Sequence, residues 1–228
     1  MEKVKAVLIK FLSEYDFPEQ AKKSILSAFD SIVHSSANKI FANFLEGYKK
    51  SCVLDYDKVE EDIAFISKNS SVNEYECNLV VFACLVDELK NHYKSAGYPD
   101  DIYSETVRGL LYKMQECYEL YGVYGANNSL GFAIYFSLKR FGIEGMQFEV
   151  IDFNRTAMVC GVTLTPTDKV INIHIPKTGK PFTKEFREKA YRKAKEFFSP
   201  YFKEKDIVPF FCHSWLLFKK WTYFFLWV

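Results

Sequence analysis

The sequence predicts an α+β protein with two domains, an all-helical N-terminal domain over residues 1–125 and a smaller α/β domain over residues 126–228. Apolar residues recur every three or four positions up to about residue 142, which is typical of helices that bury one face. After Gly145 they alternate with polar residues, the period of a strand. Because 49% of the residues are hydrophobic and 18% aromatic, the composition excludes disordered and collagen-like chains.

The N-terminal domain contains a series of amphipathic segments. Helical spacing marks residues 4–12, 25–33, 40–45, 59–66, 74–94, 102–121 and 128–140. Asp55 or Asp57 is a candidate cap for the fourth segment, because a short acidic side chain accepts hydrogen bonds from the free N–H groups that begin a helix. Gly122 is expected to end the long helix, and Gly142 to close the last.

The second domain is predicted to have the element order β-β-β-α-β. The expected elements are strands over 146–153, 157–164 and 169–175, a helix over 183–199 and a strand over 207–217. Short turns join the first three strands, so these should form an antiparallel meander. Thr183 is the expected N-cap of the helix. Because a helical crossover joins parallel strands, 169–175 and 207–217 should lie parallel.

Charge and cysteine content exclude several classes of protein. The net charge is +1 and only five residues are Arg, so there is no basic footprint for nucleic acid. No stretch reaches the ~18 uncharged apolar residues of a membrane span, and Lys219 and Lys220 interrupt the closest one. The N-terminus is typical of an amphipathic helix, not a signal peptide. Six cysteines without a CxxC pair indicate free thiols in a reducing, cytoplasmic compartment.

The loop before the last helix is a candidate anion site. Ligands of open α/β sheets bind beyond the carboxyl ends of parallel strands, near the N-termini of helices. The loop from Pro176 to Lys180 occupies that place and carries Lys177 and Lys180. Backbone N–H groups and the positive end of the helix dipole attract phosphate there. The alternative interpretation is a solvated turn, the commoner role of a Lys-rich loop.

Three titratable residues are candidates for chemistry. His174 and His213 lie near the ends of the two expected parallel strands, where both could face one gap, and Glu149 shares a strand face with Gln147. Structural histidines and a surface carboxylate are the commoner alternatives. Cys212 and His213 are adjacent, so on a strand they face opposite sides and make a poor nucleophile–base pair. The scattered His and Cys residues show no metal-ligand spacing, so no metal site is expected.

Several stretches of the second domain resemble a known family. They are Gly142-Ile143-Glu144-Gly145-Met146-Gln147-Phe148-Glu149, Asn172-Ile173-His174-Ile175-Pro176 and Cys212-His213-Ser214-Trp215-Leu216-Leu217, preceded by Tyr121-Gly122-Val123-Tyr124-Gly125. In this order and spacing they are similar to a bacterial family called acyltransferase-domain-containing, with a helical N-terminal part and a GNAT-like (Gcn5-related N-acetyltransferase-like) C-terminal part. The resemblance covers about residues 95–217 well and the N-terminal helices weakly.

The resemblance implies an acyltransferase that moves an acyl group from acyl-CoA to an amine or similar small-molecule nucleophile. By this resemblance the pyrophosphate of acyl-CoA should bind the loop before the helix at 183–199, and the acyl end should lie near His174 and His213. The implied cofactor-binding residues are Ile175, Lys177, Thr178, Gly179 and Lys180. The implied catalytic residues are His174, His213 and Glu149.

Two departures from the family keep other functions open. Pro181 stands at an outer position of the pyrophosphate signature and lacks an N–H, which favours a non-catalytic ligand-binding or interaction module. Residues 218–228 show no family likeness, so the chain is expected to be a C-terminally truncated member, for example an inactive frame-shifted product. Without later elements, the strand at 207–217 would leave an unpaired edge that invites homo-oligomerisation, with an exposed aromatic patch around residues 215–228.

Overall fold

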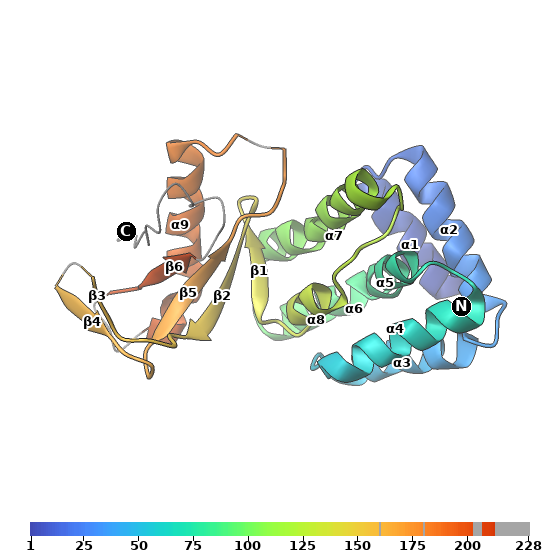
Figure 1. The fold of residues 1–228 in the computed structure, drawn as a ribbon, viewed down its shortest axis with the longest axis horizontal. Helices are drawn as coiled ribbons and strands as arrows, with labels where there is room; N and C mark the ends of the chain where they lie inside the picture. Colours follow the sequence, from blue (N-terminus) through green and yellow to red (C-terminus); the bar gives the residue numbers. More distant parts are fainter. Residues whose placement is uncertain (160, 180, 203–206, 213–228) are drawn as a thin grey trace. The chain divides into compact units, whose positions relative to one another are not determined.

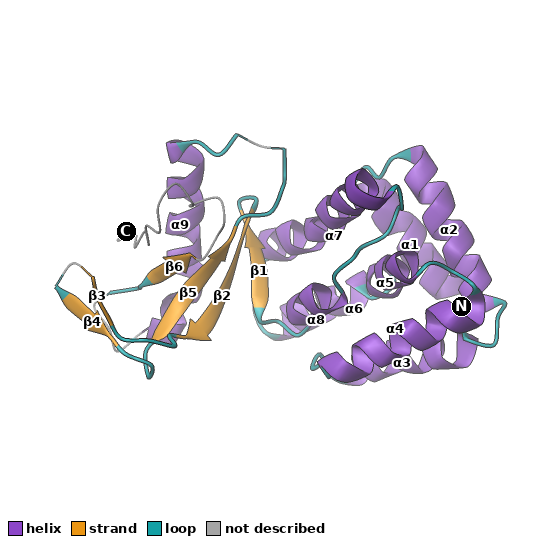
Figure 2. Cartoon of the chain, viewed as in Figure 1, coloured by secondary structure: helices purple, strands orange, loops and turns teal. Residues whose placement is uncertain are grey.

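The chain forms two compact units, Met1–Leu138 and Lys139–Val228. The structure is a computed structural model, and it describes residues 1–159, 161–179, 181–202 and 207–212. The described part of the first unit is helical, whereas the second combines strands with one long helix (Figures 1 and 2). This arrangement confirms the α+β class. The last helix of the first unit lies within 126–138, which the sequence-based division assigned to the second domain.

The first unit is built from amphipathic helices whose apolar faces meet. They are α1 (Glu2–Glu14), α2 (Glu19–Val33), α3 (Asn38–Lys50), α4 (Tyr56–Ser70), α5 (Glu74–Ala83), α6 (Val86–Ser95), α7 (Asp100–Tyr121) and α8 (Ser129–Phe136). The largest fully buried side chains here are aromatic: Phe29, Phe41, Tyr48, Phe82, Tyr93, Phe132 and Phe136. Several of these rings meet edge to face, as Phe29 and Phe41 do, the geometry that aromatic quadrupoles favour.

Local side chains begin and end these helices. Asp55 caps α4 by accepting a hydrogen bond from the Lys58 N–H at 3.1 Å, so the first of the two candidate caps is the one used. Asn73 and Asn128 cap α5 and α8 in the same way. Gly122 ends α7 at φ 69°, a left-handed conformation that costs glycine little because it has no Cβ.

Two helices differ from the sequence-based prediction. The segment 74–94 is two helices, because α5 ends at Cys84 and α6 begins after Leu85. The segment predicted as a helix over 128–140 is helical only to Phe136, and residues beyond Leu138 enter a strand. Ser137 is the C-cap of α8, and Leu138 follows at φ 55°, a left-handed conformation that does not continue a right-handed helix.

The second unit contains a four-stranded sheet, a separate hairpin and one helix. The sheet has the strand order β1 (Arg140–Ile143), β2 (Met146–Asp152), β5 (Lys169–His174) and β6 (Phe210–Cys212). The hairpin pairs β3 (Ala157–Val159) with β4 (Val162–Leu164). The helix α9 (Lys184–Phe198) joins β5 to β6, and a short 3-10 turn follows it at Ser199–Phe202.

The expected three-stranded meander is wrong in one respect. Residues 157–164 do not join the main sheet but fold back on themselves, with Gly161 at φ 81° inside the turn. The third antiparallel strand is instead β1, which the sequence analysis assigned to a helix end. Its connection to β2 is a two-residue turn, Glu144-Gly145, with φ of 52° and 79°. Positive φ at both positions matches the twist of paired strands and favours this tight hairpin.

The crossover prediction is confirmed. β5 and β6 pair in parallel, with Ile171 opposite Phe210 and Ile173 opposite Cys212, and α9 runs between them in sequence. The strand expected over 207–217 begins only at Phe210, because residues 207–209 are irregular; β6 is described over Phe210–Cys212, and residues 213–217 lie outside the described residues. Thr183 is the N-cap of α9, accepting from the Phe186 N–H at 3.2 Å, as predicted.

One face of the sheet packs against α9 (Figure 1). Phe141 of β1 contacts the ring of Phe198, and Phe148 of β2 contacts that of Tyr191. Tyr191 also meets Phe210 of β6 at 5.7 Å between ring centroids. These aromatic side chains form the core of the unit and leave the opposite face of the strands for other residues.

Candidate functional site

Polar side chains lie side by side on the face of the sheet that α9 does not cover. Arg140 of β1 is opposite Glu149 of β2, and Glu149 is opposite Asn172 of β5. Next to them, Gln147 is opposite His174. Residues opposite each other, and residues two apart on one strand, project from the same face. Three strands therefore bring five polar side chains together, a group we call the polar cluster.

Glu149 is the centre of the polar cluster. Its Oε1 lies 2.7 Å from Nε2 of His174 and accepts from Nδ2 of Asn172 at 2.9 Å. The guanidinium of Arg140 donates through Nε to Oε2 at 2.9 Å and through Nη2 to Oε1 at 3.1 Å. The Arg140 and Glu149 side chains are only 14% and 11% exposed. This is a paired, hydrogen-bonded carboxylate of the kind that tolerates burial.

The surroundings of Glu149 hold it in the charged form. Burial raises the pKa of its carboxyl, but the hydrogen bonds from His174, Arg140 and Asn172, together with the charge of Arg140, outweigh burial and lower the pKa to about 2. At neutral pH the carboxylate is ionised and a weak base. It therefore serves better as a fixed negative charge than as a proton acceptor.

The charge on Glu149 determines which nitrogen of His174 carries the proton. An ionised carboxylate can only accept, so the 2.7 Å contact requires that Nε2 donates. Nδ2 of Asn172 lies 3.0 Å from the same Nε2, but both atoms are then donors that converge on Oε1. In the neutral imidazole the lone pair consequently lies on Nδ1. The side chain of His174 is 33% exposed, so it is accessible to a reactant.

The predicted cofactor-binding residues lie on the connection from β5 to α9. Ile175 follows the last residue of β5 and is half-buried, as is Thr178, whereas Lys177 and Gly179 are exposed. Gly179 has φ 71° and open space where a Cβ would be. At the start of α9, Arg187 donates to the carbonyl oxygen of Phe182 at 3.2 Å. The structure thus places this loop directly after His174.

Some predicted features lie outside the described residues. These are Lys180, His213 and the aromatic patch at 215–228. The neighbour of His213, Cys212, is described: it is buried, and its Sγ donates to the carbonyl oxygen of Ile173 at 3.6 Å. Burial raises the pKa of the Cys212 thiol, which makes it a poor nucleophile.

Sequence reasoning missed Arg140 and Asn172. The helical period over 128–140 places Arg140 at the end of a helix, and Asn172 enters the sequence-based prediction only within the stretch Asn172-Ile173-His174-Ile175-Pro176. For Asn172 a signal exists, because it lies two residues before His174 and so shares its strand face. For Arg140 the signal is the Glu144-Gly145 dipeptide between two alternating segments, a two-residue hairpin that sets Arg140 opposite Glu149.

The same sheet face becomes apolar at its other end. Phe153, Val170 and Phe211 are buried there with Leu164 of the β3–β4 hairpin. Ile151 and Ala157 pack against this group. The hairpin therefore covers the apolar end and leaves the polar cluster at the end where β5 leads into the loop.

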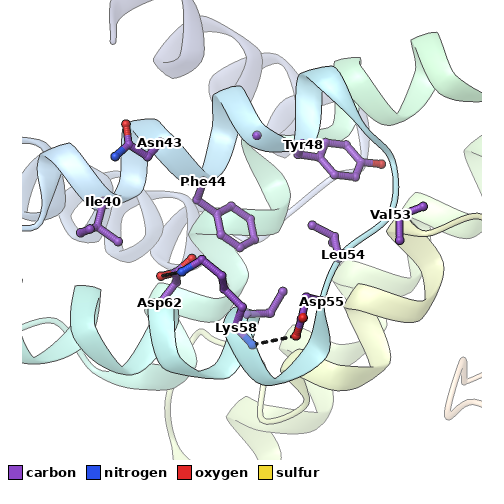
Figure 3. A pocket seen from close by; sticks show the side chains of 11 residues that line it. Ile40, Asn43, Phe44, Tyr48, Val53, Leu54, Asp55, Lys58 and Asp62 are labelled. Carbon is purple, nitrogen blue, oxygen red and sulfur yellow. Dashed lines mark hydrogen bonds and ion pairs between the residues drawn. The ribbon is translucent and has the colours of Figure 1, made fainter.

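The helical unit contains a separate cavity of about 360 Å³ between α3 and α4 (Figure 3). Phe44, Leu54 and Val59 supply an apolar lining, and a Cβ on Gly47 would meet nothing within 4 Å. At the edge, Lys58 pairs with Asp62 at 3.0 Å. No residue singled out by the sequence analysis as a candidate for chemistry lines this cavity.

Across the described ranges, no three His, Cys, Asp or Glu side chains gather as metal ligands would. None of the helices placed in the structure combines the length and apolar character that crossing a membrane requires.

Family models match both parts of the chain. The N-acyltransferase N-terminal domain matches residues 6–130, and the GNAT-like C-terminal domain matches residues 138–222. The second match continues a few residues past Leu217, where the sequence analysis saw the likeness end. A search of curated proteins finds no match.

Solved structures of acyltransferases have a similar fold. One in complex with decanoyl-CoA and teicoplanin is 14% identical over 91% of this chain, with a TM-score of 0.63. Another in complex with decanoyl-CoA is 17% identical over 91% of this chain, with a TM-score of 0.59. The match spans 61% and 62% of those chains, so this chain corresponds to somewhat less than two thirds of their length.

Proposed function

This chain belongs to the family defined by the N-acyltransferase N-terminal domain, and on that premise we propose that it transfers an acyl group from acyl-CoA to an amine or similar nucleophile. The observation that carries the proposal is the contact between His174 and ionised Glu149 at the end of β5. It supplies a base beside the loop where the GNAT-like domain is expected to receive acyl-CoA. The solved acyltransferases of similar fold that hold octanoyl-CoA or decanoyl-CoA support the choice of donor.

The proposed reaction is direct attack of the amine on the thioester. The amine nitrogen forms a bond to the carbonyl carbon, the C–S bond breaks, and CoA leaves as the thiolate. The proton lost by the amine passes to Nδ1 of His174, whose Nε2–H stays bonded to Glu149. The resulting imidazolium is stabilised by the carboxylate, and it can return the proton to the departing thiolate. Glu149 thus acts by orienting and charge, not by taking the proton itself.

The loop residues are proposed to hold the cosubstrate. We assign Ile175, Lys177, Thr178, Gly179 and Lys180 to the pantetheine and pyrophosphate of acyl-CoA, because the loop joins the last residue of β5 to the N-terminus of α9. Gly179 leaves its surroundings open for a close approach of a phosphate to the backbone. We place His213 at the acyl end with His174, as the family resemblance implies.

A substitution of His174 tests the proposed base. We expect His174→Ala to lower kcat by ~10²- to 10⁴-fold, the usual contribution of a general base, with little loss of decanoyl-CoA affinity. The assay follows release of the CoA thiol from decanoyl-CoA with a panel of small primary amines. His34→Ala is the matched control, because His34 is exposed on the helical unit and bonds to the Asp30 carbonyl oxygen. Unchanged kcat in His174→Ala would contradict the role.

A binding experiment separates the enzyme from a non-catalytic module. Titration calorimetry with acetyl-CoA and decanoyl-CoA should show binding that Lys177→Ala weakens several-fold, roughly 1 kcal/mol for one charge–phosphate contact. Lys169→Ala is the control, because Lys169 is exposed at the start of β5, away from the loop, and pairs with Asp152. Binding of decanoyl-CoA without thiol release from any amine would favour the ligand-binding alternative. No binding at millimolar ligand would remove the proposal.

We also propose a setting for the protein. Free cysteines at Cys52, Cys77, Cys84, Cys117 and Cys212 support a reducing compartment, the bacterial cytoplasm. A small-molecule acceptor is proposed, and nucleic acid is not, given the net charge of +1. β6 is the last strand at one edge of the described sheet, so a homodimer through this edge is tested by light scattering across protein concentrations.

A further inference from the structure

His174 can act as the proposed base only in one tautomer. The tautomer depends on whether Glu149 is ionised or protonated. With Glu149 ionised, Nε2 donates and Nδ1 keeps its lone pair for the incoming amine. With Glu149 protonated, the carboxyl O–H would donate to Nε2, the ring proton would move to Nδ1, and the lone pair would no longer face the reactant. The charge state of one buried carboxyl therefore decides whether His174 is a base on its accessible side.

Burial by itself favours the unproductive state. The side chain of Glu149 is only 11% exposed, and removing a carboxylate from water favours its protonated form. Asn172 donates to Oε1 at 2.9 Å, but its amide is neutral. The hydrogen bond from Nε2 of His174 also favours the carboxylate, but the neutral imidazole brings no net charge. Among the groups that contact Glu149 in the described residues, Arg140 brings a permanent positive charge.

Arg140 also has the geometry for this role. Its Nε and Nη2 reach both carboxylate oxygens, a forked contact that a Lys ammonium cannot reproduce. Strand register sets it directly opposite Glu149, on the side away from Asn172 and His174. Its side chain is 14% exposed, so solvent screens the pair little.

We infer that Arg140 is a positioning residue for acyl transfer, which keeps Glu149 ionised and thereby holds His174 in the Nε2–H tautomer. The inference rests on the proposed function for its catalytic meaning, but its structural part does not need any substrate. Arg140 lies outside the loop that is proposed to hold acyl-CoA, and the proposed reaction does not require it to contact the acyl donor.

The test reads the tautomer directly. Full-length protein labelled with ¹⁵N-histidine is studied by long-range ¹H–¹⁵N NMR, with the His174 signals assigned from their loss in His174→Gln. The wild type should show a protonated Nε2 and an unprotonated Nδ1. Arg140→Met should show a mixture or the reverse, and Arg140→Lys an intermediate state. Arg155→Met is the matched control, because Arg155 lies over the ring of Phe211 and not at Glu149.

Kinetics give the second readout. We expect Arg140→Met to lower kcat by ~10-fold or more while the KM for decanoyl-CoA changes less than ~2-fold, with partial rescue by Arg140→Lys. A His174 that keeps Nε2–H in Arg140→Met overturns the inference, whatever happens to kcat.

A second variant covers the case in which Arg140→Met does not fold. Glu149→Gln is a neutral isostere whose amide oxygen should turn to Arg140, so that its NH₂ donates to Nε2 and moves the ring proton to Nδ1. An unchanged tautomer in Glu149→Gln also overturns the inference. If the tautomer shifts as expected while His174→Ala keeps full activity, the control of the His174 tautomer by Arg140 stands and the proposed base fails, so the two outcomes are distinguishable.

Discussion

The two faces of the four-stranded sheet are built from the same strands but are stabilised in different ways. On β2, Phe148 faces α9 and is fully buried, and its neighbour Glu149 faces the other way and is 9% exposed. Phe148 meets the rings of Tyr191 and Phe210. Glu149 meets Arg140, Asn172 and His174. Similar burial therefore results from close apolar packing on one face and from charge pairing on the other.

The difference matters because the two kinds of contact respond to different changes. Apolar packing depends on shape and on the removal of surface from water, so it is sensitive to lost volume and insensitive to pH. A paired buried charge depends on protonation and on a complete set of partners. The face toward α9 thus holds the unit together, and the opposite face carries groups whose state can change during a reaction.

The largest expected loss of stability comes from a substitution that creates a cavity on the face toward α9. Phe148→Ala should reduce the free energy of unfolding of the second unit by about 3–5 kcal/mol, because it removes a fully buried ring. Hydrogen exchange read peptide by peptide should show faster exchange in β2, β5 and α9. Met158→Ala, at a side chain 76% exposed on the hairpin, is the control. A loss below about 1 kcal/mol would mean that this face is not the main core of the unit.

The second largest effect is a loss of stability at low pH, which we expect from Glu149 on the polar face. The pKa of Glu149 is about 2 in the folded protein, below its usual 4.5, so its contribution is fully present above the unfolded pKa and is lost as pH falls toward 2. This shift corresponds to about 3 kcal/mol, of which about 2 kcal/mol should disappear between pH 7 and pH 3.

Urea unfolding at the two pH values measures this loss, and a variant isolates it from other carboxyl groups. Glu149→Gln should show a smaller decrease in stability between pH 7 and pH 3 than the wild type. Glu188→Gln on the exposed side of α9 should behave like the wild type. Equal pH dependence in the wild type and Glu149→Gln would show that the polar face is not charged as the structure indicates.

The smallest expected effect is a local loss of stability at the start of α9, the helix that covers the apolar face of the sheet. Thr183→Ala removes the side chain that accepts from the Phe186 N–H, and loss of such a cap costs ~1 kcal/mol. Peptides from the first turn of α9 should exchange faster, while those from the Glu149 region of β2 change little. Thr163→Ala, exposed on β4, is the control. Equal acceleration in β2 and α9 would show that the two faces are not separable.

The sequence predicts several residues of the site but not the contacts between them. The alternation of β2 predicts that Gln147 and Glu149 share a face, and the crossover predicts that His174 lies at the carboxyl end of a strand paired in parallel. The hydrogen bond between Glu149 and His174 was not predicted, because it depends on β2 and β5 pairing directly. The sequence analysis inserted the strand at 157–164 between them, whereas that segment forms its own hairpin.

The sequence by itself determined the local features, namely the helical periods of the first unit, the strand periods of the second, the Thr183 cap and the parallel β5–β6 pair. These depend on residues close in the chain and on rules of connection, which a single sequence records. Only the tertiary structure decided that Arg140, Glu149, Asn172 and His174 meet, because their contact requires three strands in one register. Register follows from turn geometry and from the packing of the whole sheet, where a shift by one residue would turn Glu149 to the face of Phe148.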